Sequence, residues 1–270
     1  MAQTTSAPPP QPAEAPPLSG DEIHAPPTSG ELVKLSFWRQ QWVQDVLYSA
    51  EGLTRRVQRL FAGSHALARE FTKADIAPVF RANGTLNPPT DDYQGHVKEG
   101  FAYWEIKVDG LVDHPLTLTL ADLRKLPSRT QITRHDCVEG WSCIGEWTGA
   151  PLRLVLAMAK PKENARYCVF HCADPMTDSD DDGVPDTDFY YESHDLLECT
   201  HPQTLLAYAL NGKPLPIANG APVRLRAERN LGYKQAKYVQ RIELVESFAH
   251  IGGGKGGYWE DQGYNWYGGI

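Results

Sequence analysis

The sequence is short of cysteines and of long apolar runs, and each shortage argues against a class of protein. Its five cysteines are an odd number and none forms a CxxC pair. This argues against a disulfide framework and against the paired spacing of zinc fingers. No apolar run approaches the roughly 20 residues that a membrane helix needs. Basic residues are also fewer than acidic ones: the sequence has 26 Lys and Arg and 34 Asp and Glu, for a net charge of -8. This acidic balance argues against nucleic-acid binding.

The first thirty residues lack both positive charge and apolar clusters. No Lys or Arg precedes Lys34, and eight of the 21 prolines fall in this stretch. Without a basic start and an apolar centre it does not read as a signal peptide. The sequence therefore predicts a disordered Pro-rich tail over 1–30 and a cytoplasmic protein. A periplasmic location is the alternative if a leader has been removed.

Three further segments follow the tail. Residues 31–75 are predicted as an amphipathic helical extension, because Leu35, Trp38, Trp42 and Val46 approximate one apolar stripe. We expect this stripe to pack on its own domain, and docking to a partner or to a membrane surface is the alternative. Residues 76–250 are predicted as the main domain. Residues 251–270 are rich in Gly, Tyr and Trp, and we expect them to pack back on that domain.

Within the main domain, apolar residues mark strands by their alternation and helices by their spacing. This predicts an α+β fold. The predicted strands are Trp104–Val108, Leu116–Leu120, Tyr167–Cys172, Val223–Ala227 and Tyr238–Val245. The predicted helices are 119–125, which starts with a capping box, 151–160 and 202–210. We expect turns at Thr148–Pro151 and Asn211–Gly212, and an irregular loop over 80–95.

An acidic loop over Asp174–Asp188 contains oxygen ligands at alternate positions. Asp178, Asp180, Asp182 and Asp186 surround a glycine, as in calcium-binding loops. The twelfth position is Phe189, where an EF-hand needs a glutamate. The loop is therefore interpreted as a calcium site or as a solvated acidic loop, and the latter is favoured.

The stretch from Arg134 to Trp147 surrounds one thiol with polar groups. Cys137 lies near Arg134 and His135, which can hold it as a thiolate that attacks electrophiles or binds a soft metal. A cysteine hydrolase with His135 as base is one alternative, and a buried, unreactive thiol is another. Cations in Asn219–Lys237 favour an anion site nearby.

The residues around Cys137 also resemble a known family. Cys137-Val-Glu-Gly-Trp-Ser and Trp147-Thr-Gly-Ala-Pro-Leu are followed by Asn211-Gly-Lys-Pro, by Asn219-Gly-Ala-Pro-Val-Arg, and by Gly232-Tyr-Lys-Gln-Ala-Lys. Over about Phe80 to Val245 this series resembles the sulfite-oxidase-fold molybdopterin oxidoreductases. Within that family it is most similar to catalytic subunits of bacterial protein-methionine-sulfoxide reductases and their uncharacterised relatives.

The resemblance implies a fold and a set of site residues. The fold is the sulfite oxidase type, with mixed β-sheets and short flanking helices. Cys137 becomes the protein ligand of molybdenum, which a pterin dithiolene also holds, and it shares the active site with Glu139, Trp141 and Tyr190. The residues implied to contact the cofactor are Phe80, Arg81, Asn83, Cys137, Cys172, Asn219, Arg224, Lys234, Gln235, Ala236 and Lys237.

Departures from the family pattern bear on the substrate. Sulfite oxidases place an arginine shortly after the metal cysteine, whereas this chain has Val138, Glu139, Gly140 and Trp141. A carboxylate repels a dianion. We therefore expect oxygen-atom transfer from a neutral S- or N-oxide. The alternatives are a sulfite oxidase-like or dehydrogenase-like enzyme acting on an oxyanion, and a non-catalytic module that binds the cofactor.

The same resemblance bears on partners. The chain has no CxxCH haem-attachment motif, so a separate haem or flavin protein is expected to exchange electrons with it. Sulfite oxidases carry a C-terminal dimerisation domain that this chain lacks, which predicts a monomer. Membrane contact is expected only through a partner.

Overall fold

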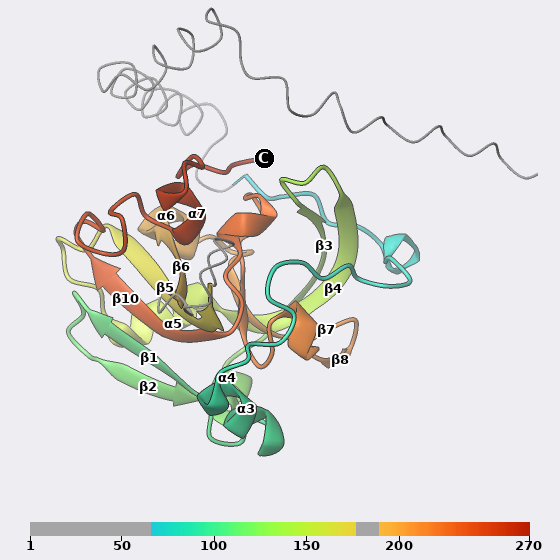
Figure 1. The fold of residues 1–270 in the computed structure, drawn as a ribbon, viewed down its shortest axis with the longest axis horizontal. Coiled ribbons are helices and arrows are strands. Elements are labelled where there is room, and N and C mark those ends of the chain that lie inside the picture. Colours follow the sequence, from blue (N-terminus) through green and yellow to red (C-terminus); the bar gives the residue numbers. More distant parts are fainter. Residues whose placement is uncertain (1–65, 177–188) are drawn as a thin grey trace, which may run out of the picture. The chain divides into compact units, whose positions relative to one another are not determined.

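Two β-sheets frame residues 66–176 and 189–270, the part of the chain that this computed structural model describes (Figure 1). One sheet has the strand order β2-β1-β10-β5-β6, and the other has β3-β4-β7-β8, with β9 paired to β7. The strands are β1 Glu105–Gly110, β2 Leu116–Thr119, β3 Arg129–Asp136, β4 Ser142–Pro151, β5 Tyr167–Pro175, β6 Phe189–Asp195, β7 Leu205–Leu210, β8 Lys213–Pro214, β9 Arg224–Arg226 and β10 Val239–Val245. The predicted α+β class is confirmed.

Short helices connect the strands. They are α3 Asp91–Lys98, α4 Leu120–Lys125, α5 Leu152–Ala159, α6 Leu196–Cys199 and α7 Tyr258–Asp261, with 3₁₀ turns η1 Lys73–Asp75, η2 Ile217–Asn219 and η3 Gly232–Lys234. Among the described residues, no helix is both long and apolar enough to cross a membrane. The predictions for the 1–30 tail, for the Leu35–Val46 stripe and for Asp178–Asp186 lie outside the described residues.

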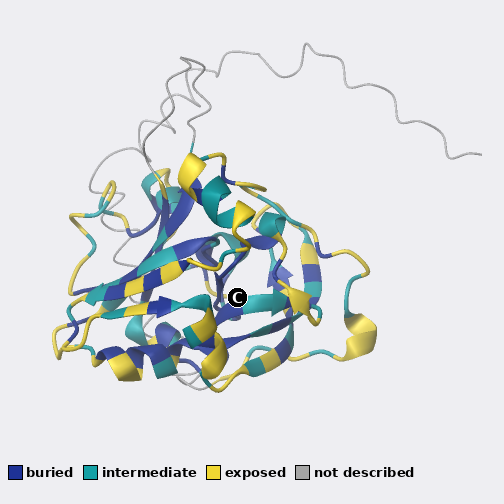
Figure 2. Ribbon diagram, turned by 90° about the horizontal axis from the view of Figure 1, so that it is seen from below, coloured by how far each residue is buried: buried dark blue, intermediate teal, exposed yellow. Residues whose placement is uncertain are grey.

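The first sheet has the predicted alternation. In β1, Ile106 and Val108 are buried while Glu105 and Lys107 are exposed, so one face of the strand meets the core. β1 pairs with β10 in parallel, with Lys107 opposite Arg241. Figure 2 shows this banding of buried and exposed positions along the strands.

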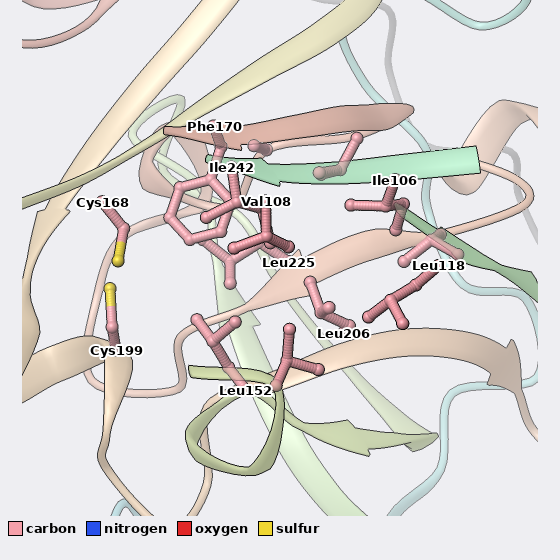
Figure 3. Close-up of a cluster of buried hydrophobic side chains, with 14 of the residues drawn as sticks. Ile106, Val108, Leu118, Leu152, Cys168, Phe170, Cys199, Leu206, Leu225 and Ile242 are labelled. Atoms are coloured by element: carbon pink, nitrogen blue, oxygen red, sulfur yellow. The ribbon is translucent and has the colours of Figure 1, made fainter. Parts of the chain in front are cut away.

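The main core lies where side chains of the two sheets meet. Figure 3 shows Ile106, Phe170 and Ile242 of the first sheet on one side, with Leu206 and Leu225 of the second sheet on the other. All five are fully buried. Each such side chain contributes roughly 1.5–3 kcal/mol by leaving water, so this layer holds the sheets together.

Two predicted helices form where the sequence places them. In α4, Thr119 and Asp122 exchange the hydrogen bonds of a capping box. In α5, the predicted inward residues Leu152, Val155, Leu156 and Ala159 are the ones buried. Apolar spacing at i, i+3 and i+4 therefore identifies the buried face of α5 correctly.

The helix predicted over 202–210 is wrong, because Leu205–Leu210 is the strand β7. This strand pairs with β4 on one side and with β8 and β9 on the other. Leu205, Leu206 and Ala207 are all fully buried. A strand buried on both faces has an unbroken apolar sequence, which cannot be distinguished from a buried helix by periodicity alone.

The turn predicted at Thr148–Pro151 is also wrong, since β4 continues to Pro151. Its pairing with β7 shifts register between Thr148 and Gly149. A Cβ atom on Gly149 would lie 2.3 Å from the carbonyl oxygen of Leu206. Glycine is therefore needed here for close approach of two backbones rather than for a turn.

Two predicted loops are shorter than expected. The loop from Phe80 ends at Thr90, whose side chain accepts a hydrogen bond from the Tyr93 amide and caps α3. Asp174, predicted as the start of the acidic loop, lies within β5 and is buried. Both corrections matter below, because the shortened loop and Asp174 reach the same cavity.

Candidate functional site

Cys137 lies at the tip of the β3–β4 hairpin. The Cys137 amide donates to the Trp141 carbonyl at 2.9 Å, and the Gly140 amide donates to the Cys137 carbonyl at 3.0 Å. Gly140 has a φ of 86°, a conformation that glycine adopts at no steric cost. The hairpin backbone thus fixes the cysteine independently of its own side chain, which is 7% exposed and lines a cavity.

The expectation that Arg134 and His135 hold Cys137 as a thiolate is wrong. Arg134 pairs with Asp136, and His135 Nδ1 lies 2.9 Å from the Arg226 guanidinium. Burial first, then Arg226, moves the pKa of His135 well below its usual range. Burial raises the pKa of the Cys137 thiol. His135 is bonded to Arg226 rather than to Cys137, so it is not placed to act as the base that a cysteine hydrolase would need.

The Asn83 side chain faces the thiol from a second segment. Its Nδ2 lies 3.4 Å from Cys137 Sγ and donates to it. The Lys237 ammonium holds this loop by donating to the carbonyl oxygens of Asn83 at 2.8 Å, Thr85, and Ala218 at 3.2 Å. Three segments distant in sequence are thereby joined beside the sulfur.

Arg224 forms a buried part of the cavity wall. Its guanidinium donates to the carbonyls of Asn219 and Gln235, both at 3.0 Å, and lies 5.2 Å from the Trp147 ring centroid. Burial, and next the charge of Arg226, lower its pKa to about 9. Two of its nitrogens donate hydrogen bonds to backbone carbonyls, so the Arg224 side chain has two roles: it holds the cavity wall together and it places a positive charge there.

Asp174 is a second carboxyl group in the cavity, besides Glu139. It is 4% exposed, and its Oδ1 has no hydrogen-bond partner. Burial raises its pKa to about 7, and the charge of Lys237 opposes that shift. Burial likewise lowers the pKa of Lys237 to about 7. The sequence analysis assigned Asp174 to the acidic loop and missed it as a site residue.

The wild-type domain is expected to become less stable as the pH rises from about 4 to 7, and we expect Asp174→Asn to remove this decline. Because the pKa of Asp174 rises from 3.8 to about 7 on folding, the folded state binds more protons across this window, and stability falls as the pH rises through it. Lys237 has the opposite effect: because its pKa is lowered from 10.5, it makes stability rise with pH above pH 7. The free energy of unfolding of the wild type, measured with urea, should fall by on the order of 2 kcal/mol from pH 5 to pH 7. The variant should not show this fall.

A matched control is Asp122→Asn. This carboxyl is exposed, and hydrogen bonds from Lys125 and Thr119 lower its pKa to about 2, below the window. The control should keep the wild-type slope between pH 5 and pH 7. Equal slopes in wild type and Asp174→Asn would contradict the raised pKa of Asp174.

Glu139 lies at the exposed rim of the cavity. Its carboxylate accepts from Trp141 Nε1 at 2.8 Å and lies 4.0 Å from Arg81, whose guanidinium is 4.6 Å from the Trp141 ring centroid. The Arg81 and Glu139 side chains are 60% and 58% exposed, so this ion pair adds little stability. Deeper in, the Tyr190 hydroxyl donates to the Tyr233 carbonyl.

The cavity brings together part of the predicted site. The predicted residues that line it are Asn83, Cys137, Glu139, Tyr190, Arg224, Gln235 and Lys237. The other predicted residues do not line it, and these are Phe80, Arg81, Trp141, Cys172, Asn219, Lys234 and Ala236. The Lys234 ammonium is buried against Glu192 and Glu260. Lining residues that the sequence analysis missed include Thr85, Asp174, Met176, Tyr233, Trp259 and Tyr264.

The residues around the cavity fit the cofactor that the resemblance implies. The volume is about 170 Å³, far above the roughly 10–15 Å³ that one water needs. Three lining residues carry a buried polar atom without a partner, namely Arg224 Nε, Gln235 Oε1 and Asp174 Oδ1. Such atoms are satisfied by a polar ligand, and Cys137 is a soft donor suited to molybdenum.

Other metal sites receive no support from the described residues, which contain no cluster of three His, Cys, Asp or Glu able to hold an ion. The Asp178–Asp186 part of the acidic loop, for which calcium binding was the less favoured interpretation, lies outside those residues, and none of the comparisons below points to calcium. All five cysteines are free thiols.

A comparison with protein families matches residues 94–250 to the oxidoreductase molybdopterin binding domain. This match covers more than half of the chain and includes the Cys137 hairpin, Arg224 and Lys237. It confirms the resemblance inferred from the sequence motifs.

Individual relatives agree with that family. The chain is 38% identical over 203 residues to a putative protein-methionine-sulfoxide reductase subunit, YedZ1, of Azospira oryzae, covering 74% of this chain and 70% of the relative. It is 37% identical over 146 residues to the protein-methionine-sulfoxide reductase catalytic subunit MsrP of Campylobacter jejuni, covering 53% and 49%. The Ralstonia nicotianae MsrP gives 38% over 145 residues, covering 53% and 44%. The chain thus spans about half the length of these MsrP relatives.

Among solved structures, the chain is similar to the sulfane dehydrogenase SoxCD from Paracoccus pantotrophus. The TM-score is 0.47 at 22% sequence identity, over 54% of this chain and 39% of that one.

Proposed function

The chain belongs to the oxidoreductase molybdopterin-binding domain family, and from that premise we propose that it reduces neutral S-oxides by removing their oxygen atom. Methionine sulfoxide and similar alkyl sulfoxides are the substrate class. In the net reaction the S–O bond breaks, the sulfur gains two electrons, and the oxygen leaves as water with two protons. N-oxides of comparable size are the secondary substrates.

One observation carries the choice of a neutral substrate: two carboxyl groups, Glu139 and Asp174, line the cavity that contains Cys137. The Glu139 carboxylate, and Asp174 whenever it is ionised, repel a dianion such as sulfite, and the repulsion is stronger in a partly dry cavity than in water. The cations that line it, Arg224 and Lys237, donate to backbone carbonyls. The names of the reductase relatives also support sulfoxide reduction.

Residues of the chain have separate tasks in this proposal. When bound, molybdopterin with its metal supplies the two-electron chemistry. Cys137 is the protein ligand of the metal, and Asn83, whose amide faces the Cys137 sulfur, orients that ligand. Gln235 and Arg224, which line the cavity, offer buried polar atoms without a partner that would hold the organic part of the cofactor. Asp174 is placed to hold one of the two protons that the oxygen takes up.

The electrons come from a separate protein. The YedZ1 and MsrP relatives are described as subunits, which supports a division of labour between this chain and an electron carrier. We propose a haem or flavin protein as that carrier.

The test uses protein produced in a host that makes molybdopterin. Mass spectrometry should find about one molybdenum per chain, and acid release should yield about one fluorescent pterin. With reduced viologen as donor, N-acetylmethionine sulfoxide should be reduced with a kcat/KM at least about 100-fold above that for sulfite oxidation with ferricyanide, which is about 2.7 kcal/mol of discrimination. Rapid sulfite turnover would overturn the proposal. Absence of molybdenum would overturn the cofactor assignment itself.

A further inference from the structure

The C-terminal segment, residues 251–270, supplies part of the cavity wall. The match to the family ends at residue 250, yet Trp259 and Tyr264 line the same cavity as Cys137. Any selectivity these two rings provide is therefore a property of this chain beyond the matched domain.

Backbone pairing holds this segment firmly against the domain. Isolated β-bridges join Gly257 to Glu192 and Gly269 to Asn230. The Leu231 amide donates to the Gly268 carbonyl at 2.7 Å. The expectation that the aromatic tail packs back on the domain is confirmed, and the segment is a fixed wall rather than a loose end.

A buried ion cluster fixes the two sides of the wall. The Lys234 ammonium contacts the carboxylates of Glu192 and Glu260, and all three side chains are at most 2% exposed. Tyr233 and Trp259, the immediate neighbours of Lys234 and Glu260, both line the cavity. A buried cation between two carboxylates tolerates little displacement, so it holds both rings in position.

The rings form one aromatic surface. Trp259 and Tyr264 are stacked, with centroids 5.4 Å apart and planes at 29°. Tyr233 meets Tyr264 edge-on at 5.3 Å and 87°. Aromatic rings attract sulfur, by about 0.3–1.5 kcal/mol per contact, and they bury alkyl groups well. This surface therefore suits a ligand with an uncharged sulfur and an apolar arm.

We propose that Trp259 and Tyr264 select the substrate by binding the sulfur and the alkyl arm of the S-oxide. This inference rests on the proposed function and adds to it the part of the chain that recognises the substrate. It predicts that selectivity depends on the arm: a sulfoxide with a methionine-like arm gains from the two rings, whereas dimethyl sulfoxide, which has no arm, gains little.

The experiment compares Trp259→Ala and Tyr264→Ala with wild type in the cofactor-loaded enzyme. For N-acetylmethionine sulfoxide, KM should rise about tenfold, as expected for a lost apolar contact, with kcat within about twofold. For dimethyl sulfoxide, KM should change by less than about threefold. Molybdenum and pterin per chain should equal wild type.

Trp266→Phe is the matched control. Trp266 belongs to the same segment but stacks on Phe248, and it is not among the residues that line the cavity. This variant should leave both KM values unchanged. Equal rises for both substrates, an unchanged KM, or loss of cofactor from Trp259→Ala and Tyr264→Ala would overturn the inference.

A binding measurement separates this inference from the proposed function. Isothermal titration of wild type with N-acetylmethionine sulfoxide, without electron donor, should give a Kd about tenfold lower than Trp259→Ala gives. If wild type binds the sulfoxide in this way but does not reduce it, the proposed function fails while the recognition surface stands. If wild type reduces it and the variants bind equally well, only the recognition surface fails.

Discussion

Cys137→Ser is expected to abolish oxygen-atom transfer and to leave the fold intact. A serine hydroxyl is a hard donor that stays protonated near neutral pH, so it replaces a thiolate poorly on a soft metal. The hairpin is held by the backbone bonds between Cys137, Gly140 and Trp141, which the substitution does not touch. The hydrogen bond that the Asn83 side chain donates to the sulfur is long, at 3.4 Å, so little stability depends on it.

The measurement pairs activity with metal content and thermal unfolding. Activity of Cys137→Ser should fall to background, while its unfolding midpoint stays close to wild type. Cys143→Ser is the control, because Cys143 is equally buried at 7% exposure and lies in the same hairpin, with its sulfur 3.7 Å from the Val79 carbonyl. This control should keep most of the activity. Full activity in Cys137→Ser would remove the molybdenum assignment.

Sequence periodicity predicted those strands and helices that have one solvent-exposed face and one buried face. β1 alternates because only one of its faces meets the core, and α5 shows its buried side at helical spacing. β7 lies in the centre of its sheet and is buried throughout its first half, so its sequence carries no such signal. Its neighbours, distant along the chain, decide that it is a strand.

Residues of the site differ in the same way. Cys137 was identified because unusual residues surround it in sequence and match a family motif. Asp174 and Trp259 were not, because they reach the cavity through tertiary structure: one at the end of β5 and the other from α7. Cofactor-contact candidates such as Phe80 and Cys172 share segments with lining residues but point into the core. Sequence proximity to a motif thus identifies the segment, and only packing determines which side chain faces the cavity.

The second large effect is expected for Arg226→Met, which should destabilise the domain by about 3–5 kcal/mol. The Arg226 guanidinium is fully buried, bonds both oxygens of Glu228 at 3.0 and 2.6 Å, and contacts His135 Nδ1 at 2.9 Å. It also lies 4.3 Å from the Trp147 ring centroid. Methionine fills a similar volume but leaves the Glu228 carboxylate buried, with the Gln131 side chain as its one remaining side-chain donor among the described residues. Thermal unfolding should show a midpoint about 10 °C below wild type.

The double variant Arg226→Met with Glu228→Gln distinguishes two causes of the lost stability. One is the buried Glu228 carboxylate left without its cation, called the stranded carboxylate below, and the other is lost packing. If the stranded carboxylate causes the destabilisation, removing its charge should restore more than half of the lost stability, because neutral partners of similar shape are tolerated in a core. Arg241→Met is the exposed comparison: Arg241 is 36% exposed and pairs with Asp109 and Glu243, so the stability lost in this variant should be below about 1 kcal/mol.

His135 loses its hydrogen-bond donor in Arg226→Met, and it lies two residues before Cys137 on β3. Molybdenum per chain should therefore fall along with stability in the single variant. Unchanged stability there would show that Glu228 finds another partner and that this network does not fix the hairpin.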